Sequence, residues 1–296
     1  MFVGLQYMVT PYSNNFIDLS KDICYNLKVI VLKGGGRMLK EILSAALAVI
    51  QVALSCPADY IKPEVPDNSY IIHGAGIYGG LKTTNSYEAL QNAYNAGNRY
   101  IELDFNFTSD LKPVCLHDWN HLSFSGYNGV TPTLEEFMEG SIYSTFTPMS
   151  LDTVAEFMDK HKDLYIITDV KDYNIYFAGL IKKNYPHLLD RFIIQVYSAG
   201  HYEDISNLGF PNIIFSLYKL DWETKTNAGY FVSFSKKHKV YGYTFPAELC
   251  RIEGFVDGML GTNASLFVHT VNDNEEQQKY FDMGITGIYT DNTIHK

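Results

Sequence analysis

From residue 70 onward, short apolar runs alternate with longer stretches in which apolar residues recur at helical spacing. A strand that is buried on both faces gives a short apolar run, and repeated strand–helix alternation indicates parallel strands joined by helices. We interpret as strands the runs at residues 70–73, 100–106, 164–169, 191–196, 212–216, 240–243, 266–270 and 287–289. Eight such strands predict an α/β fold of the (β/α)8 TIM-barrel type.

One region departs from this alternation, directly after the second predicted strand. Residues 112–117 form another apolar run behind the turn residues Ser109 and Asp110, which predicts the return arm of a hairpin. Residues 120–149 follow and are too many for an ordinary barrel connection. We therefore expect a small β-hairpin and loop insertion here. The loop would either shape a substrate pocket or form a surface insertion.

Polar side chains interrupt the apolar pattern of the second strand. Glu102 and Asp104 alternate with Leu103 and Phe105, so strand periodicity sends both carboxylates to one face. Two neighbouring carboxylates repel each other, and a hard cation such as Mg²⁺ or Ca²⁺, which takes oxygen ligands, relieves that repulsion. Taken alone, the pair favours a solvent-facing acidic strand.

Two histidines change this interpretation. His73 ends the run that starts at Tyr70 and is followed by Gly74, while His117 ends the return arm of the hairpin and is followed by Asp118. A single histidine at a strand end is more often structural, but two that flank a pair of carboxylates indicate a site. Active sites of TIM barrels are built at the C-terminal ends of the strands, where we expect these groups to lie. The pattern indicates acid–base chemistry at a metal ion.

The ordered set of motifs resembles the glycerophosphodiester phosphodiesterase family, which belongs to the phospholipase C-like phosphodiesterase superfamily. The matching segments follow one another along most of the chain. They lie at residues 73, 85–89, 96–97, 100–104, 108–110, 117–118, 165–171, 267–272 and 287–291.

The resemblance implies metal-dependent hydrolysis of a small-molecule glycerophosphodiester to glycerol phosphate and an alcohol. It implies that Glu102, Asp104 and Asp169 hold one divalent cation, Mg²⁺ or Ca²⁺. Asp169 would contribute from the third predicted barrel strand. A phosphodiester hydrolase of this kind would be an enzyme of lipid metabolism.

The resemblance also implies the remaining roles in the site. His73 and His117 would act as the general acid and the general base, with the order between them left open. Lys171 would contact the phosphate. His269 or Asn272 would face the glycerol.

The chain departs from the family pattern at three positions. Gly74 stands where members commonly carry an arginine that contacts the phosphate. Asp169 stands where glutamate is usual, one methylene shorter, and His269 stands where many members have tryptophan. These departures bear on the identity of the substrate more than on the reaction.

The amino-acid composition limits the classes of molecule that the protein is expected to bind. The formal net charge is −10, and the 23 lysines and arginines form no cluster, which excludes the electrostatic footprint of a nucleic-acid-binding protein. The bound cation and Lys171 would supply local positive charge for an anionic substrate. The four cysteines show neither metal-ligand spacing nor a disulfide framework.

Residues 1–60 precede the predicted barrel, which we place at residues 61–296. Within them, residues 42–55 form an apolar run that is too short to span a bilayer core of ~30 Å comfortably. Read from Met38, the segment is typical of a signal peptide, whereas its helical apolar stripe is also typical of a helix docked on the barrel. Membrane or cell-envelope association and a cytoplasmic location both stay open, as does the oligomeric state.

Two other functions remain open from the sequence. One is a phospholipase D-like or phosphoinositide-cleaving enzyme that acts on intact lipid. The other is a catalytically silent barrel that binds glycans or lipids, which the missing arginine and the 23 tyrosines would suit.

Overall fold

A computed structural model describes residues 65–120 and 122–294 of the chain. The predictions made for residues 1–60, including the apolar segment 42–55 and the boundary before residue 61, lie outside the described residues. Among the residues that are described, no helix combines the length and the apolar character needed to cross a membrane.

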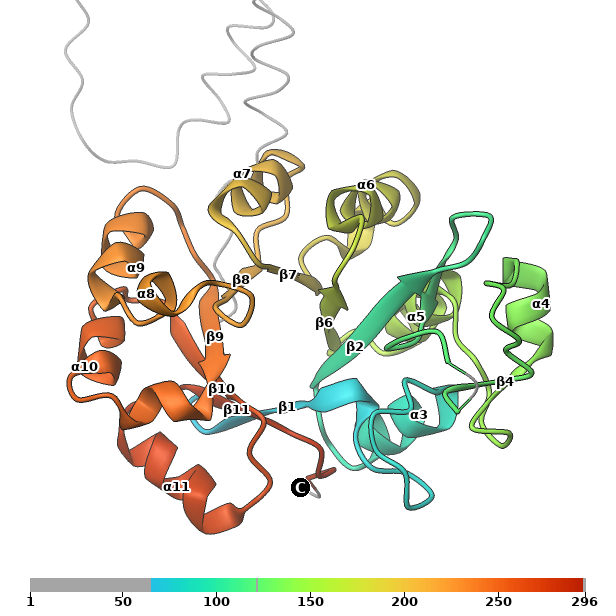
Figure 1. The fold of residues 1–296 in the computed structure, drawn as a ribbon, viewed down its shortest axis with the longest axis horizontal. Helices are drawn as coiled ribbons and strands as arrows, with labels where there is room; N and C mark the ends of the chain where they lie inside the picture. Colours follow the sequence, from blue (N-terminus) through green and yellow to red (C-terminus); the bar gives the residue numbers. More distant parts are fainter. Residues whose placement is uncertain (1–64, 121, 295–296) are drawn as a thin grey trace, which may run out of the picture. The chain divides into compact units, whose positions relative to one another are not determined.

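Within these residues, eight parallel strands close into a barrel, which confirms the predicted (β/α)8 fold (Figure 1). Closure is made by β1, which pairs in parallel with β2 on one side and with β11 on the other. Around the barrel the strands are β1 (Ser69–Ile72), β2 (Tyr100–Phe107), β6 (Tyr165–Val170), β7 (Phe192–Val196), β8 (Ile213–Ser216), β9 (Gly242–Pro246), β10 (Ser265–His269) and β11 (Gly287–Thr290).

Seven of the eight predicted strands have bounds within one residue of the observed ones, and two differences are of interest. His73 lies just past β1, in the short 3-10 helix η1 (His73–Ala75), because the chain turns away directly after Ile72. β9 begins and ends later than predicted, since the residues up to Pro246 pair with β10. Pro246 lies beyond the pairing of β9 with β8, which ends at Thr244, so on that side no ladder hydrogen bond is lost.

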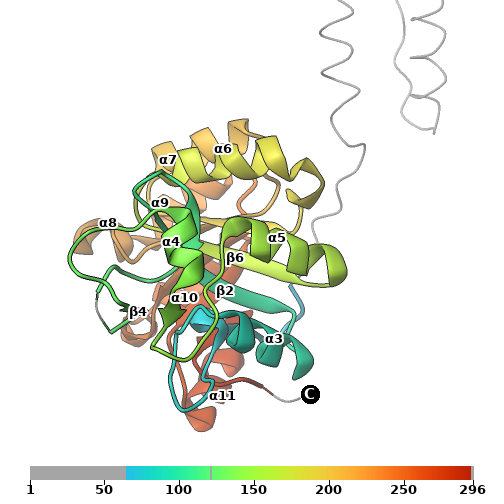
Figure 2. The same cartoon turned by 90° about the vertical axis from the view of Figure 1, so that its right-hand side faces the viewer.

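Helices surround the barrel, as two perpendicular views show (Figures 1 and 2). Several begin at a residue whose side chain accepts a hydrogen bond from the first turn, such as Ser86 before α3 and Ser150 before α5. The helices are α3 (Tyr87–Asn95), α4 (Leu134–Glu139), α5 (Leu151–Lys160), α6 (Asn174–Asn184), α7 (Ala199–Asn207), α8 (Trp222–Lys225), α9 (Ala228–Ser235), α10 (Phe255–Leu260) and α11 (Asn274–Asp282), with 3-10 turns η2 (Pro186–Leu188) and η3 (Ala247–Arg251).

The core has two layers because successive residues of each strand point to opposite faces. On β6, Ile166 packs toward the helices and Ile167 packs inside the barrel, and both are fully buried. The barrel interior is filled by large side chains from several strands, among them Tyr241, Phe267 and Tyr289. Burial on both faces is why the strands appear in the sequence as continuous apolar runs.

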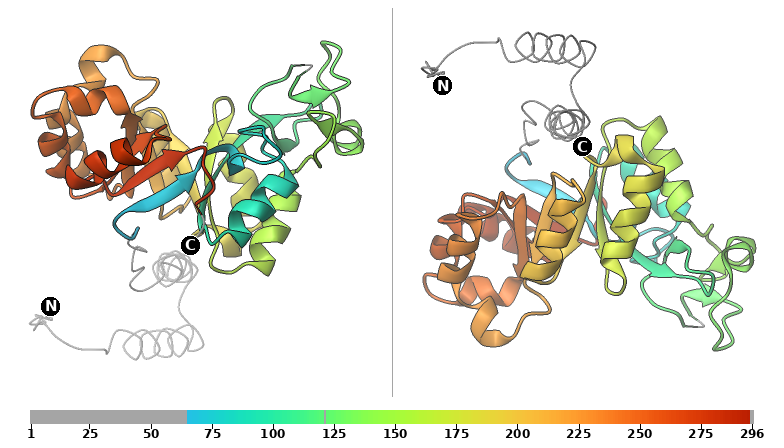
Figure 3. Two further views of the ribbon diagram at one scale, coloured as in Figure 1. Left: turned by 90° about the horizontal axis from the view of Figure 1, so that it is seen from below. Right: turned by 90° about the horizontal axis from the view of Figure 1, so that it is seen from above.

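The predicted hairpin and loop insertion are also confirmed. β2 continues past the barrel to Phe107 and pairs in antiparallel fashion with β3 (Pro113–Cys115). The loop that follows contains the short antiparallel pair β4 (Phe124–Ser125) and β5 (Ser141–Ile142), next to α4. In Figures 1 and 3 this insertion, in green, lies beside the end of β2 and on the opposite side of the barrel from α10.

Candidate active site

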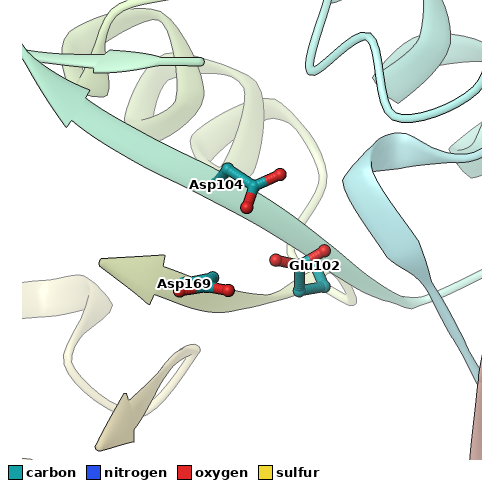
Figure 4. Close-up of side chains that lie close together, drawn as sticks. All are labelled: Glu102, Asp104 and Asp169. Atoms are coloured by element: carbon teal, nitrogen blue, oxygen red, sulfur yellow. The ribbon is translucent and has the colours of Figure 1, made fainter. Parts of the chain in front are cut away.

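Three carboxylates from two adjacent strands point toward one another inside the mouth of the barrel (Figure 4). Glu102 and Asp104 come from β2, and Asp169 comes from β6, where it is the register partner of Asp104. Each offers one oxygen, and these oxygens lie within 4.8 Å of one another. Glu102 and Asp104 are each only 2% exposed. The strand alternation expected from the sequence places Glu102 and Asp104 together, and the parallel pairing of β2 with β6 adds Asp169.

The electrostatics of this cluster fit a hard divalent cation. Burial, with the neighbouring Asp104 carboxylate, raises the pKa of both Glu102 and Asp169 above their ordinary values. The Nζ atom of Lys171 lies 3.9 Å from Oδ1 of Asp104. Lys171 therefore brings one positive charge to a cluster of three carboxylates. Closely spaced buried oxygens of this kind are the ligands that Mg²⁺ and Ca²⁺ prefer.

Gly74 holds one of these carboxylates through its backbone. Its N–H donates a 2.7 Å hydrogen bond to Oε2 of Glu102. Gly74 has a φ of 54°, and a Cβ atom built there would lie 2.6 Å from Cα of Thr83. No side chain fits at this position without a backbone shift. The absence of an arginine here is therefore built into the local backbone.

The other two carboxylates are also oriented by dedicated donors. The side-chain amide of Asn85 donates to Oδ2 of Asp104 at 2.9 Å, and its oxygen accepts from the backbone N–H of Asp104 at 3.0 Å. The hydroxyl of Tyr197, directly after β7, donates to Oδ1 of Asp169. Hydrogen bonds of this kind fix the orientation of potential ligand oxygens.

His73 is fixed between two acidic side chains. Its Nδ1 donates to Oδ1 of Asp291 at 2.9 Å, while its Nε2 lies 3.8 Å from Oε2 of Glu102. Burial disfavours the charged imidazole, but Glu102 and Asp291 outweigh it and raise the pKa of His73 to about 9. Asp291 is itself held by the amide of Asn272 at 2.8 Å. In this state His73 carries a proton.

His117 also pairs its Nδ1 with an aspartate, but it differs from His73 at its Nε2 atom. Its Nε2 accepts from the Nζ of Lys171 at 2.8 Å, so its Nδ1 carries the hydrogen and donates to Asp118 at 2.8 Å. The hairpin brings His117 back beside β2, as expected from the sequence, and leaves its side chain about half exposed, at 49%. One histidine of the site is thus charged and the other presents an acceptor nitrogen.

A cavity of about 180 Å³ joins these groups. His73, His117, Glu102, Asp169 and Lys171 all border it, so most of the residues expected from the sequence meet at one cavity. The other polar side chains that line it are Gln195, Tyr197, Ser216, Tyr218, His269, Thr270 and Tyr289.

Two expected substrate-binding residues, His269 and Asn272, lie at the end of β10 and shortly after it. His269 borders the cavity, and its Nδ1 is 2.9 Å from Oγ1 of Thr244. Burial lowers the pKa of His269 to about 4. Asn272 is not among the lining residues, because its amide contacts Asp291 and accepts from the hydroxyl of Thr290.

Sequence analysis assigned no role to three residues that shape the site. Asp291 follows β11, Tyr197 follows β7, and Asn85 precedes α3. Two signals point to Asp291: it ends the family-matching segment 287–291, and it directly follows the last strand, which lies beside the first strand of a closed barrel. Asn85 lies in the family-matching segment 85–89, which gave it a signal but no role, and Tyr197 carries no comparable signal.

Comparison with known families and structures gives consistent results. The model of the Glycerophosphoryl diester phosphodiesterase family matches residues 78–295. The comparison with curated proteins gives no significant match.

Solved structures of several phosphodiesterases have folds similar to that of this chain. A glycerophosphodiester phosphodiesterase from Thermotoga maritima superposes with a TM-score of 0.59 at 21% identity, over 77% of this chain and 96% of its own. One from Parabacteroides distasonis gives 0.61 at 19% identity, over 76% and 94%. An Oleispira antarctica phosphodiesterase, in complex with the product sn-glycerol-3-phosphate, gives 0.60 at 15% identity, over 76% and 93%. At these identities the likeness establishes the fold.

Proposed function

The chain belongs to the glycerophosphoryl diester phosphodiesterase family and is a phosphoric diester hydrolase, and we propose that it converts glycerophosphodiesters to glycerol phosphate and an alcohol at this site. The observation that carries the proposal is the buried three-carboxylate cluster, of which Glu102 and Asp169 border one cavity together with His73 and His117. Such a set combines cation binding with acid–base chemistry.

Glu102, Asp104 and Asp169 would hold one divalent cation, either Mg²⁺ or Ca²⁺. When bound, such a cation neutralises negative charge on the phosphate oxygens and so favours the transition state. Support comes from the short distances among the three ligand oxygens and from the raised pKa of two of the three carboxyl groups. Gly74, Asn85 and Tyr197 would keep the ligand oxygens oriented.

His73 and His117 would move the two protons of the reaction. One removes the proton of the attacking hydroxyl as its oxygen bonds to phosphorus, and the other gives a proton to the oxygen of the departing alcohol. The attacking hydroxyl belongs either to water or to the glycerol itself. In the second case a cyclic phosphate forms first, and water then opens it.

The remaining positive charge would come from Lys171. Its ammonium lies between His117 and Asp104, where it can contact a phosphate oxygen in place of the missing arginine. His269 borders the same cavity and would face the glycerol. Asn272 would support that side through Asp291, whose carboxylate it contacts.

The test is a substrate panel with Mg²⁺, with Ca²⁺ and after exhaustive chelation, in which glycerol phosphate and free alcohol are both quantified. We expect glycerol phosphate in the presence of at least one cation and none after chelation. Release of a headgroup from diacyl phospholipids with no release from water-soluble diesters would instead favour an enzyme of intact lipid. No turnover of either class would favour the catalytically silent barrel.

A further inference from the structure

A second cavity adjoins the site on the side of the hairpin. It has a volume of about 520 Å³ and is bordered by Asp104, His117, Asp169 and Lys171, three of which also border the first cavity. His73 borders the first cavity and not this one. His117 and Lys171 therefore stand at the junction of two spaces, where the phosphate of a diester would lie.

A diester bound at this junction would direct its two alcohol groups into different spaces. In displacement at phosphorus, the attacking and leaving oxygens lie roughly in line, on opposite sides of the phosphorus atom. The first cavity is the smaller and offers hydroxyl, amide and imidazole groups, which suit a glycerol. The second is the larger and lies between the hairpin and the loop after β6, so it is the space left for the second alcohol.

Aromatic rings line the second cavity. They belong to Phe105 and Phe107 on β2, Trp119 after the hairpin and Tyr173 after β6. The indole N–H of Trp119 donates to the backbone oxygen of Phe107 at 3.2 Å, and the rings of Phe107 and Tyr173 lie 5.8 Å apart at 83°. The rings are thus held in place by one another and by the strand.

The charged groups of this cavity outside the catalytic set are acidic. Asp118 and Asp172 both line it, and hydrogen bonds from His117 and Asn120 lower the pKa of Asp118, which keeps it ionised. Lys171 is the one lysine or arginine among its lining residues. Aromatic faces combined with carboxylates are the surroundings in which proteins bind ammonium groups.

We propose that this second cavity binds the leaving alcohol of the diester and that it favours an alcohol carrying an ammonium or quaternary ammonium group. The proposal rests on the proposed function, because it takes the phosphate to lie between His117 and Lys171. It adds a substrate class that the catalytic residues themselves do not specify.

The experiment compares two esters of glycerol phosphate that differ in charge and not in shape. One carries choline, and the other carries 3,3-dimethylbutanol, in which carbon replaces the nitrogen. A cation–π contribution of about 0.5–2 kcal/mol corresponds to a ~2- to ~30-fold higher kcat/KM for the choline ester. Choline should also inhibit competitively at lower concentration than 3,3-dimethylbutanol.

Two variants locate the preference. Tyr173→Leu and Asp172→Asn, both at exposed positions, should bring the ratio of the two kcat/KM values toward one. Tyr176→Leu is the matched control, because Tyr176 is also exposed and its ring lies 5.9 Å from that of Phe107, but it does not line the cavity. The control should retain the wild-type ratio.

The possible results separate the two proposals. Hydrolysis of both esters at equal kcat/KM, or a ratio that Tyr173→Leu and Asp172→Asn leave unchanged, would overturn the ammonium subsite and leave the reaction standing. Faster hydrolysis of the neutral ester would do the same. No hydrolysis of either ester with Mg²⁺ or Ca²⁺ would overturn the reaction and the subsite together.

Discussion

The backbone N–H of Gly74 donates a 2.7 Å hydrogen bond to Oε2 of Glu102, so the turn after β1 directly supports the carboxylate cluster of β2. Gly74 packs so closely against Thr83 that a Cβ atom built on it would lie 2.6 Å from Cα of Thr83, where it has no room. The glycine-rich turn and the missing arginine are consequently one structural feature. In the proposed reaction, the positive charge that contacts the phosphate comes from Lys171.

Substitution of Gly74 should therefore lower the free energy of unfolding and weaken cation binding. Gly74→Ala combines a left-handed φ with a Cβ at 2.6 Å from Thr83 Cα, and we expect it to lower the free energy of unfolding by ~2–4 kcal/mol. Gly80→Ala is the control, since Gly80 also has a positive φ but open space around it, and should lose only ~1–2 kcal/mol. Equal losses in urea unfolding would contradict the close-approach explanation.

His117→Gln should reduce kcat for a glycerophosphodiester by about 10²- to 10⁴-fold, because one proton-transfer group is removed. The thermal melting curve should change little, since the side chain is half exposed. His187→Gln is the matched control, because His187 is also exposed and pairs with the carboxylate of Asp159. His187 borders neither cavity of the site. Wild-type turnover by a folded His117→Gln variant would exclude a catalytic role.

Cation affinity should rise with pH. In the cation-free chain, burial and Asp104 raise the pKa of Glu102 from 4.5 to about 8, and a cation must displace the proton that Glu102 then holds. Affinity should increase across that interval and level off above it. Calorimetric titration in two buffers of different ionisation enthalpy should show proton release. Binding with no proton release and no pH dependence would contradict this account.

The ion pair of His73 and Asp291 should make the stability of the cation-free protein depend on pH. The pKa of His73 is raised to about 9, so its contribution is complete below its ordinary pKa of 6.5 and is lost as the pH rises through 9. The pKa of Asp291 is lowered to about 2 despite burial, because His73 and Asn272 donate to it. Its contribution is therefore present above 3.8 and is lost as the pH falls through 2.

Asp291→Asn should flatten the decline in stability between pH 6.5 and 9, since it removes one of the three carboxylates, with Glu102 and Asp104, that raise the pKa of His73. Urea unfolding in the presence of a chelator, at several pH values for both proteins, measures the difference. Glu102 also titrates in this pH interval, but it is present in both the wild type and the variant, so its contribution cancels in the comparison. Parallel stability profiles would show that Asp291 does not govern the protonation of His73.

Much of the site could be predicted because its signals are local. Glu102 and Asp104 share a face through the two-residue period of a strand, and the hairpin turn at Ser109 and Asp110 returns His117 to β2. We expected the site residues to lie at the C-terminal ends of their strands, but Glu102 is the third residue of the eight-residue strand β2. β2 is longer than its barrel neighbours because its last residues, beyond the register with β6, pair with β3.

The sequence by itself determined the eight strands, because burial on both faces leaves a continuous apolar run, and it determined the facing of the two carboxylates on β2. Tertiary structure alone decided which distant groups meet. Asp291 reaches His73 across 218 residues because β11 closes the barrel against β1, and Tyr197 reaches Asp169 because β7 is the neighbour of β6. The periodicity of apolar residues predicts which face of a helix or strand is buried, but it does not predict which other element packs against that face. Register and closure supply that partner only once the whole sheet has formed.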